Sequence, residues 1–350
     1  STAAAGMLTP ALEAHEGGPL LSLARQSLTR YRDVAAALRQ ETGIDIGLRQ
    51  CGALAVALSG AEAERLADRA KMLRAAGVQI EAVSGAEARQ REPEIGPAVV
   101  AAMAVPSEAQ VEPRPLLKAL AIAAERAGAR FHAGEVVRGI IPAGDGVGGV
   151  ALHDRVLETG CVVVAAGSWT MQVAALELPK EAIFPVRGQM VRLEQRTPAL
   201  RQILFGEGGY VLPRPAGELL CGSTLERVGF RREVTVAGLS QILQHSTTLM
   251  PALAHATVDA HWSNFRPATP DGRPLIGALP RRGLYIASGH YRSGILWAPI
   301  TADILTQALS GGPQVAGADH VAPNRLRHDD TATTHAALPT PRHPTAPHWH

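Results

Sequence analysis

Two kinds of strand-forming segment occur in this chain, and together they restrict the folds that it can adopt. Residues 161–169, CVVVAAGSW, form a continuous apolar run, which is typical of a strand buried on both faces of a parallel sheet. Residues 184–195, FPVRGQMVRLEQ, instead alternate apolar and polar side chains, as in a strand with one face in the core. Segments with helical spacing lie before and after them. We therefore predict two intertwined domains, one of α/β type and one of α+β type.

Several segments carry the end signals of helices. Residues 20–40 repeat apolar side chains at helical spacing and stop before a glycine, which suits a C-terminal cap. Ser59 with Glu62, and Ser84 with Glu87, have the spacing of a capping box at the start of a helix. Further helices are predicted over residues 112–128, over 236–250 and from about Ser293 to 309.

Strand-like segments joined by short turns predict antiparallel pairing. Residues 209–226 have the pattern of a hairpin around a Pro-Ala-Gly turn, and residues 129–141 and 149–154 that of strands in a small sheet. Residues 144–149, GDGVGG, formally match the G-x-G-x-x-G motif. A phosphate-binding turn of that kind needs a helix behind it, whereas a strand-like segment follows here. We interpret the run as a hairpin turn.

Length, composition and net charge argue against several classes of protein. The 350 residues suffice for about two domains, and 46% hydrophobic with 19% charged residues is the balance of a soluble globular protein. A net charge of +2 without basic runs gives no reason to expect nucleic acid as a partner. No apolar stretch reaches the roughly 18 residues of a membrane span. No signal peptide is visible, so a cytoplasmic location is expected.

Cysteine and histidine usage gives no metal site. Cys51, Cys161 and Cys221 lie in apolar, strand-like runs without metal-ligand spacing, so we expect buried free thiols in a reducing compartment. The end of the chain, residues 319–350, is polar and rich in proline, and its histidines follow no ligand spacing. We predict a disordered tail there.

Arg266 is the strongest polar candidate for a binding site. It follows the strand-like segment HATVDAHWSNF and opens the turn-rich run RPATPDGRPLIG. Because Pro267 restricts the backbone around it, the arginine has little freedom to move. It is either a solvated charge at a loop tip or a guanidinium held at a sheet edge to form two parallel hydrogen bonds with a carboxylate. Composition and spacing leave both interpretations open.

Residues 285–300, YIASGHYRSGILWAPI, predict a strand, a glycine-bearing turn and a helix that begins near Ser293. The start of such a helix offers free N–H groups and a positive dipole to an anion, although an ordinary strand–turn–helix connection has the same pattern. Ser288, His290 and Ser293 lack a G-x-S-x-G elbow and an acid to orient the histidine. We therefore expect a structural histidine.

Taken together, the segments resemble the glycine oxidases of the D-amino-acid oxidase family. Singly each match is weak, but the pieces follow the family's order to about residue 326, which makes the set specific. The matching pieces are STAAAGML (1–8), VEPRPLLKAL (111–120), VVVAAGSW (162–169), PVRGQMVRL (185–193), GGYVLPR (208–214), LLCGSTLE (219–226), FRPATPDGRPLIG (265–277) and GLYIASGHYRSGILWAP (283–299).

The resemblance implies an α/β plus α+β fold with non-covalently bound FAD. It places a discontinuous Rossmann-like FAD-binding domain at residues 1–48, 103–180 and 266–318, and an antiparallel-sheet substrate domain at 49–102 and 181–265. It implies that Arg266 and Tyr210 bind the substrate carboxylate. The further residues implied are Leu225, Arg292 and Met7 around the substrate, and Ala3, Ala4, Ala5, Gly6, Met7, Val137, Gly167, His290, Tyr291, Arg292, Ser293, Gly294, Ile295 and Leu296 around FAD.

The implied reaction is the oxidation of glycine, small amines or D-amino acids by dioxygen, giving an imine or glyoxylate, ammonia and hydrogen peroxide for thiamine thiazole synthesis. A sarcosine oxidase-like enzyme or an amino-acid dehydrogenase of the same family are alternatives. The family's first strand, its G-x-G-x-x-G turn and the next helix find no match here, so we expect an incomplete FAD-binding domain. A truncated protein without FAD is then a third alternative. The oligomeric state, a homo-oligomer included, stays open.

Overall fold

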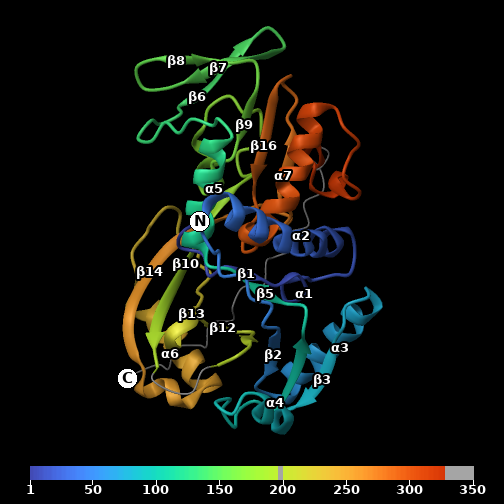
Figure 1. Ribbon diagram of the computed structural model, residues 1–350, viewed down its shortest axis with the longest axis vertical. Coiled ribbons are helices and arrows are strands. Elements are labelled where there is room, and N and C mark those ends of the chain that lie inside the picture. The colour runs from blue at the N-terminus through green and yellow to red at the C-terminus, as the bar shows by residue number, and fades with distance from the viewer. Residues whose placement is uncertain (196–199, 328–350) are drawn as a thin grey trace, which may run out of the picture.

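The computed structural model describes residues 1–195 and 200–327 of the chain. It has two parts, one around an eight-stranded sheet and one around a smaller sheet beside long helices (Figure 1). The N-terminal residues lie where the two parts meet (Figure 1). The mixed α/β composition predicted from the sequence is therefore confirmed.

The eight-stranded sheet has the order β14-β10-β13-β12-β11-β2-β4-β3. Its pairs are antiparallel except for β11 and β2, which run parallel. The longest pair, β10 and β14, places Val186 opposite Arg266. The strands are β2 (Ala53–Ala57), β3 (Glu81–Ser84), β4 (Ala101–Val105), β10 (Phe184–Glu194), β11 (Ile203–Gly206), β12 (Gly209–Pro213), β13 (Glu218–Gly222) and β14 (Thr257–Ala268).

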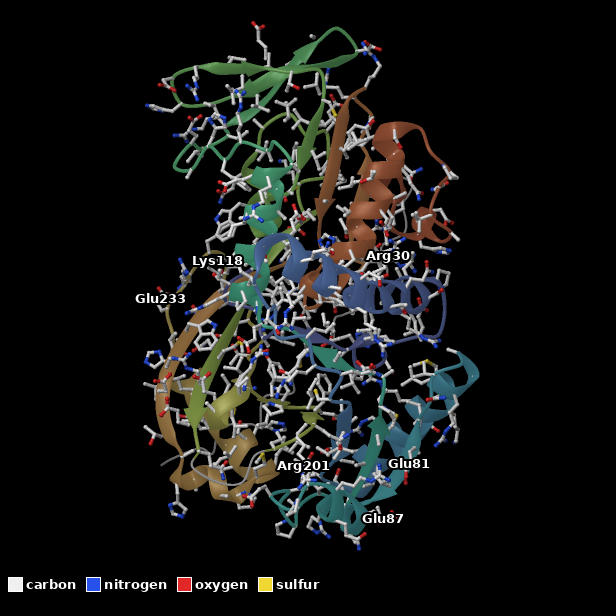
Figure 2. All side chains as sticks on the ribbon, viewed as in Figure 1. Arg30, Glu81, Glu87, Lys118, Arg201 and Glu233 are labelled. Atoms are coloured by element: carbon white, nitrogen blue, oxygen red, sulfur yellow. The ribbon has the colours of Figure 1, made fainter. Side chains whose placement is uncertain are left out.

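Apolar side chains cover both faces of this sheet. One face carries Val191, Val211 and Cys221 and packs with Ile242 of α6 (Val236–Leu249) and Ala88 of α4 (Gly85–Arg91). The other face packs with the N-terminal segment, α1 (Pro10–Glu13) and α3 (Gly60–Ala75). Exposed charged side chains such as Glu81, Glu87 and Arg201 lie at the far end of this part (Figure 2).

The second part has a sheet of order β15-β16-β9, in which β16 and β9 run parallel. Three helices share an apolar core with it, to which Leu23, Leu116 and Trp297 contribute. Its strands are β15 (Leu275–Ala278), β16 (Leu284–Ser288) and β9 (Val162–Val164), and its helices are α2 (Pro19–Thr42), α5 (Pro113–Arg126) and α7 (Gly294–Ser310).

Short elements complete the fold. A three-stranded meander lies at the top of Figure 1, and a two-stranded pair joins the N-terminal segment to the start of α5. These elements are β1 (Met7–Leu8), β5 (Ala109–Gln110), β6 (Gly139–Ala143), β7 (Gly146–Ala151), β8 (Val156–Glu158), η1 (Gly167–Gln172), η2 (Pro215–Gly217), η3 (Pro251–His255), η4 (Ala318–Val321) and η5 (Pro323–Arg327).

Most local predictions are confirmed. Helix α2 ends at Gly43 with a left-handed φ of 76°, a conformation that glycine adopts without strain. Ser84 and Glu87 form the full capping box, whereas Ser59 accepts a hydrogen bond from the Glu62 N–H without the reciprocal half. Gly144 and Asp145 of the GDGVGG run form the hairpin turn between β6 and β7, as expected, and the last four residues of the run belong to β7. Among the described residues, no helix is long and apolar enough to cross a membrane.

The sequence predictions for residues 129–138, for residues 161–169 and for two of the cysteines are wrong. Residues 161–169 are not a fully buried strand, because β9 is the edge strand of its sheet in the described part of the chain and Val163 is 38% exposed. Cys161, just before this edge strand, is exposed, and Cys51 is only partly buried. Residues 129–138 form an irregular connection in place of a strand.

The predicted disordered tail begins too early. Residues 319–327 form 3-10 turns, and Val321 is completely buried in the core that includes Leu23 and Ala318. The segment is polar on average, so its composition did not indicate that Val321 would be buried in the core. The rest of the predicted tail, residues 328–350, lies outside the described residues.

Candidate active site

The register of the large sheet gathers side chains from four strands on one face. Phe205 of β11 is paired with Tyr210 of β12, and Tyr210 with Gly222 of β13. Gly222 is paired with Met190 of β10, two residues from Gly188, and Val186 on the same face lies opposite Arg266. Side chains of paired residues point to the same face of a sheet. Tyr210 and Arg266 therefore lie on one surface.

Two glycines make room for these side chains. A Cβ at Gly188 would overlap the Arg266 guanidinium, so this side chain lies flat across β10. A Cβ at Gly222 would lie 2.8 Å from the Tyr210 hydroxyl. Sequence reasoning missed both glycines, because their role depends on the register between strands. Arg266 itself lies two residues inside β14, and not at a loop tip.

The Arg266 guanidinium is held by oxygens of the segment after β13. Nη2 donates a hydrogen bond to Ser223 Oγ at 2.7 Å, and Nη1 donates to the Thr224 carbonyl at 3.2 Å. Arg266 belongs to none of the ion pairs found among the described residues. Burial lowers its pKa, which the Tyr210 hydroxyl partly offsets. An arginine stays charged in proteins, and two of its five donors are used here, so the remainder suit a carboxylate.

Tyr210 supplies a second donor on this surface. Its side chain is 4% exposed, and its hydroxyl is 3.6 Å from Met190 Sδ, a weak acceptor. Burial raises the pKa of Tyr210, while Arg266 and Arg292 oppose the shift. The phenol therefore stays protonated at neutral pH and can donate to an anion.

Arg292 reaches this surface from the turn between β16 and α7. Its guanidinium lies 5.7 Å from the centre of the Phe205 ring, and Nη2 is 3.1 Å from Glu13 Oε1. The neighbouring Tyr291 has a φ of 49°, and its N–H donates to the Pro267 carbonyl at 2.8 Å. Burial acts to lower the pKa of Arg292, but the charge and hydrogen bond of Glu13 together with Tyr291 and Tyr210 outweigh it, and the pKa is raised.

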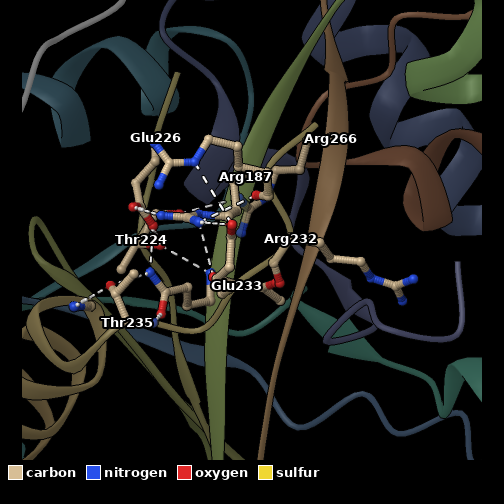
Figure 3. Close-up of polar contacts among 11 residues, drawn as sticks. Arg187, Thr224, Glu226, Arg232, Glu233, Thr235 and Arg266 are labelled. Atoms are coloured by element: carbon tan, nitrogen blue, oxygen red, sulfur yellow. Dashed lines mark hydrogen bonds and ion pairs between the residues drawn. The ribbon is translucent and has the colours of Figure 1, made fainter. Parts of the chain in front are cut away.

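A polar network on the reverse face of β10 holds the segment that binds Arg266. Arg187 is buried and pairs with Glu226 at 2.5 Å (Figure 3). Thr224 Oγ1 donates to Glu226 Oε1 at 2.6 Å and accepts from the Gln189 N–H at 3.0 Å. Burial would raise the pKa of Glu226, yet the hydrogen bonds from Arg187, Thr224 and Gln189 and the charge of Arg187 together lower it. Thr224 thus contacts both this network and Arg266.

The other predicted site residues fall into two groups. Residues 3–7 pass beside the sheet, where the Trp262 Nε1–H donates to the Ala3 carbonyl at 3.0 Å. Gly6 has a φ of 78°, and a Cβ there would overlap the Val111 carbonyl. Ala4 and Met7 are partly buried, Ala5 is buried, and Leu225 is partly buried beside Thr224.

The second group surrounds the start of α7. His290 Nε2 is 3.0 Å from Thr301 Oγ1, and burial lowers its pKa to about 4, so the expected structural histidine is neutral and has a polar partner. Gly167 accepts hydrogen bonds from Thr170 and Ser288 hydroxyls through its carbonyl. Val137 is exposed on the irregular connection, two residues before β6. Ser293, Gly294, Ile295 and Leu296 are the cap and first turn of α7.

The residues at this helix start fit a bound flavin nucleotide. Ser293 makes no side-chain cap, so the first N–H groups of α7 keep free donors for a polar ring or an anion. Gly167 has a φ of 54° and open space where a Cβ would stand, and Trp169 offers an exposed apolar surface nearby in the chain. Among the described residues, no group of three or more potential ligands could hold a metal ion.

Comparison with known proteins agrees with this geometry. The family "FAD dependent oxidoreductase" (DAO) matches residues 1–308. The chain belongs to this family. The match begins at residue 1 and gives no support to the expectation that the first dinucleotide-binding unit is missing.

Several relatives of this FAD-dependent oxidoreductase are similar over most of its length. It is 35% identical to a glycine oxidase of Geobacillus kaustophilus over 86% of the chain and 80% of the relative. The crystal structure of glycine oxidase from Geobacillus kaustophilus matches with a TM-score of 0.89 over 93% of this chain and 88% of the other. A "Bifunctional protein ThiO/ThiG" of Nostoc is 34% identical over 88% of the chain, which spans only 46% of that longer protein.

Proposed function

We propose that this FAD-dependent oxidoreductase oxidises glycine and similar small amino acids with dioxygen. The observation that carries the proposal is the Arg266 guanidinium, partly buried without a carboxylate partner among the described residues and on the same surface as the Tyr210 hydroxyl. Two guanidinium donors and one phenol donor match the two oxygens of a carboxylate. The similarity to proteins named glycine oxidase supports the same substrate class.

The two donors act by positioning. Arg266 and Tyr210 hold the substrate carboxylate and so fix the direction of the Cα–H bond. This positioning lowers the entropic part of the activation barrier. When FAD is bound, it supplies an acceptor for the two electrons released in the oxidation of the Cα–H bond. The substrate leaves as an imine, which water converts to glyoxylate and ammonia, and the electrons reduce dioxygen to hydrogen peroxide. No side-chain base is needed if the amine binds in its neutral form.

We further propose how the residues divide between the ligands. Residues 1–48, 103–180 and 266–318 would bind FAD, with contacts from residues 3–7, Val137, Gly167 and the turn and helix start at 290–296. Residues 49–102 and 181–265 would form the substrate domain. Leu225, partly buried one residue after Thr224, would limit the size of the substrate side chain. Arg292 and Met7 would line the same pocket.

The physiological setting is also part of the proposal. The imine formed from glycine would be used in thiamine thiazole synthesis, and the similarity to relatives named ThiO/ThiG supports this setting. A cytoplasmic location stays a prediction, as does a homo-oligomeric state.

The test is a product balance with the FAD-loaded protein. Glycine and N-methylglycine are supplied separately, and oxygen consumed, hydrogen peroxide, glyoxylate and ammonia are quantified. One peroxide and one glyoxylate per oxygen with glycine would support the proposal. Turnover that needs an artificial acceptor and leaves oxygen unused would instead identify a dehydrogenase, and a marked preference for N-methylglycine would identify a sarcosine oxidase-like enzyme.

A further inference from the structure

A second cation lies at the proposed substrate surface, but it already has a partner. Arg292 lies over Phe205, the cross-strand neighbour of Tyr210, so its guanidinium is beside the residue proposed to hold the carboxylate. Glu13 at the end of α1 is 3.1 Å from its Nη2. The side chains are 23% and 17% exposed, so the pair is largely shielded from water and still partly accessible.

The pair differs in kind from the other cation of the site. Arg266 is bound by a hydroxyl and a carbonyl, which are neutral and leave its charge uncompensated. Arg292 is bound by a carboxylate, which cancels its charge at short range. Of the two arginines Arg266 and Arg292, only Arg266 therefore keeps an uncompensated charge, and this matches a substrate with one carboxylate.

We infer that Glu13 is a specificity-determining residue that masks Arg292 and restricts the site to monocarboxylates. The inference rests on the proposed function. The class of ligand excluded by the mask is a dicarboxylate, such as a glycine whose nitrogen carries a second carboxymethyl group. Such a ligand would bring a negative charge toward Glu13 and would have to compete with it for Arg292. Removing the charge of Glu13 frees Arg292 to act as a second carboxylate site.

The inference is tested with matched ligands that are not oxidised. Methoxyacetate and oxydiacetate differ by one carboxylate, and their dissociation constants are measured by calorimetry on the FAD-loaded protein. In Glu13→Gln we expect the affinity for oxydiacetate to rise about tenfold more than that for methoxyacetate, the scale of one charge-assisted hydrogen bond. Adding Arg292→Met to this variant should return the ratio of the two affinities to the wild-type value.

Two controls separate the mask from a general change of charge. Glu207→Gln removes an acid from the exposed pair with Arg65, outside the pocket, and should leave the affinity ratio unchanged. Glu13→Asp keeps the charge and should behave as wild type. An equal gain for both ligands in Glu13→Gln, or a raised ratio that persists without Arg292, would overturn the inference.

Turnover distinguishes this inference from the proposed function. The ratio of kcat/KM for N-carboxymethylglycine over N-methylglycine should rise in Glu13→Gln in parallel with the binding ratio. Failure of the wild-type protein to oxidise glycine would refute the proposed function, whereas the binding ratio would still test the mask. Oxidation of glycine with an unchanged binding ratio in Glu13→Gln would refute only the mask.

Discussion

At the residue scale, Gly188 determines where the Arg266 side chain can lie. The guanidinium crosses β10 at the position where any Cβ would overlap it. In Gly188→Ala we expect Arg266 to be displaced from Ser223 and Thr224, and the KM for glycine to rise at least about tenfold, the loss of one good hydrogen bond to a charged group. Gly60→Ala is the control, because nothing lies within 4 Å of a Cβ at this helix start. Equal KM values in the two variants would show that Arg266 does not need this space.

The second residue-scale prediction concerns the proton of Tyr210. Burial raises its pKa, so the phenol keeps its proton, and hence its donor, to a higher pH than an exposed tyrosine with a pKa of about 10. The KM of Tyr210→Phe relative to wild type should therefore stay constant from about pH 6 to pH 10. The measurement is the KM ratio at each pH. A ratio that falls toward one below pH 9 would mean that the hydroxyl ionises early and donates nothing.

At the element scale, the segment after β13 is held from behind by Arg187. Removing this partner leaves Glu226 without its main cation on a partly buried site. In Arg187→Met we expect the free energy of unfolding to fall by about 3 kcal/mol and the KM for glycine to rise, because Thr224 no longer positions Arg266. Arg192→Met on the same strand breaks a more exposed pair with Asp259 and should cost less than about 1 kcal/mol. Chemical denaturation and steady-state kinetics check both variants, and a normal KM in Arg187→Met would separate the network from the site.

At the scale of the whole molecule, the C-terminal turns close the core of the helical part. Val321 is completely buried, whereas Val236 at the start of α6 is 83% exposed. We expect Val321→Ala to lower the free energy of unfolding by about 2 kcal/mol through the cavity it leaves, and Val236→Ala to change it by less than about 0.5 kcal/mol. Denaturant titration measures both. Equal stabilities would mean that residues 318–327 do not contribute to the core.

The features that depend on neighbouring residues in the chain could be predicted from the sequence, and those that depend on the pairing of distant segments could not. Helix ends, the hairpin predicted over 209–226 and the strand before Pro267 depend on neighbours in the chain. These predictions are confirmed, with the hairpin strands ending at Gly222. The burial of 161–169 depends on whether a strand pairs on both edges, which periodicity does not report. The same holds for the site: Arg266 was a candidate from its local setting, and the resemblance indicated its role and added Tyr210. The Glu13–Arg292 pair joins residues 279 positions apart and leaves no local pattern.

The account depends most on Arg266 as the ligand of the substrate carboxylate. The measurement that tests it is the rate and concentration dependence of flavin bleaching when glycine is mixed anaerobically with the FAD-loaded protein. In Arg266→Met the half-saturating glycine concentration should rise about thirtyfold or more, since loss of a desolvated charge partner costs about 2–5 kcal/mol. Arg273→Met, the same charge change in the turn that follows, should stay within about twofold of wild type. Near-normal saturation by glycine in Arg266→Met would contradict the assignment.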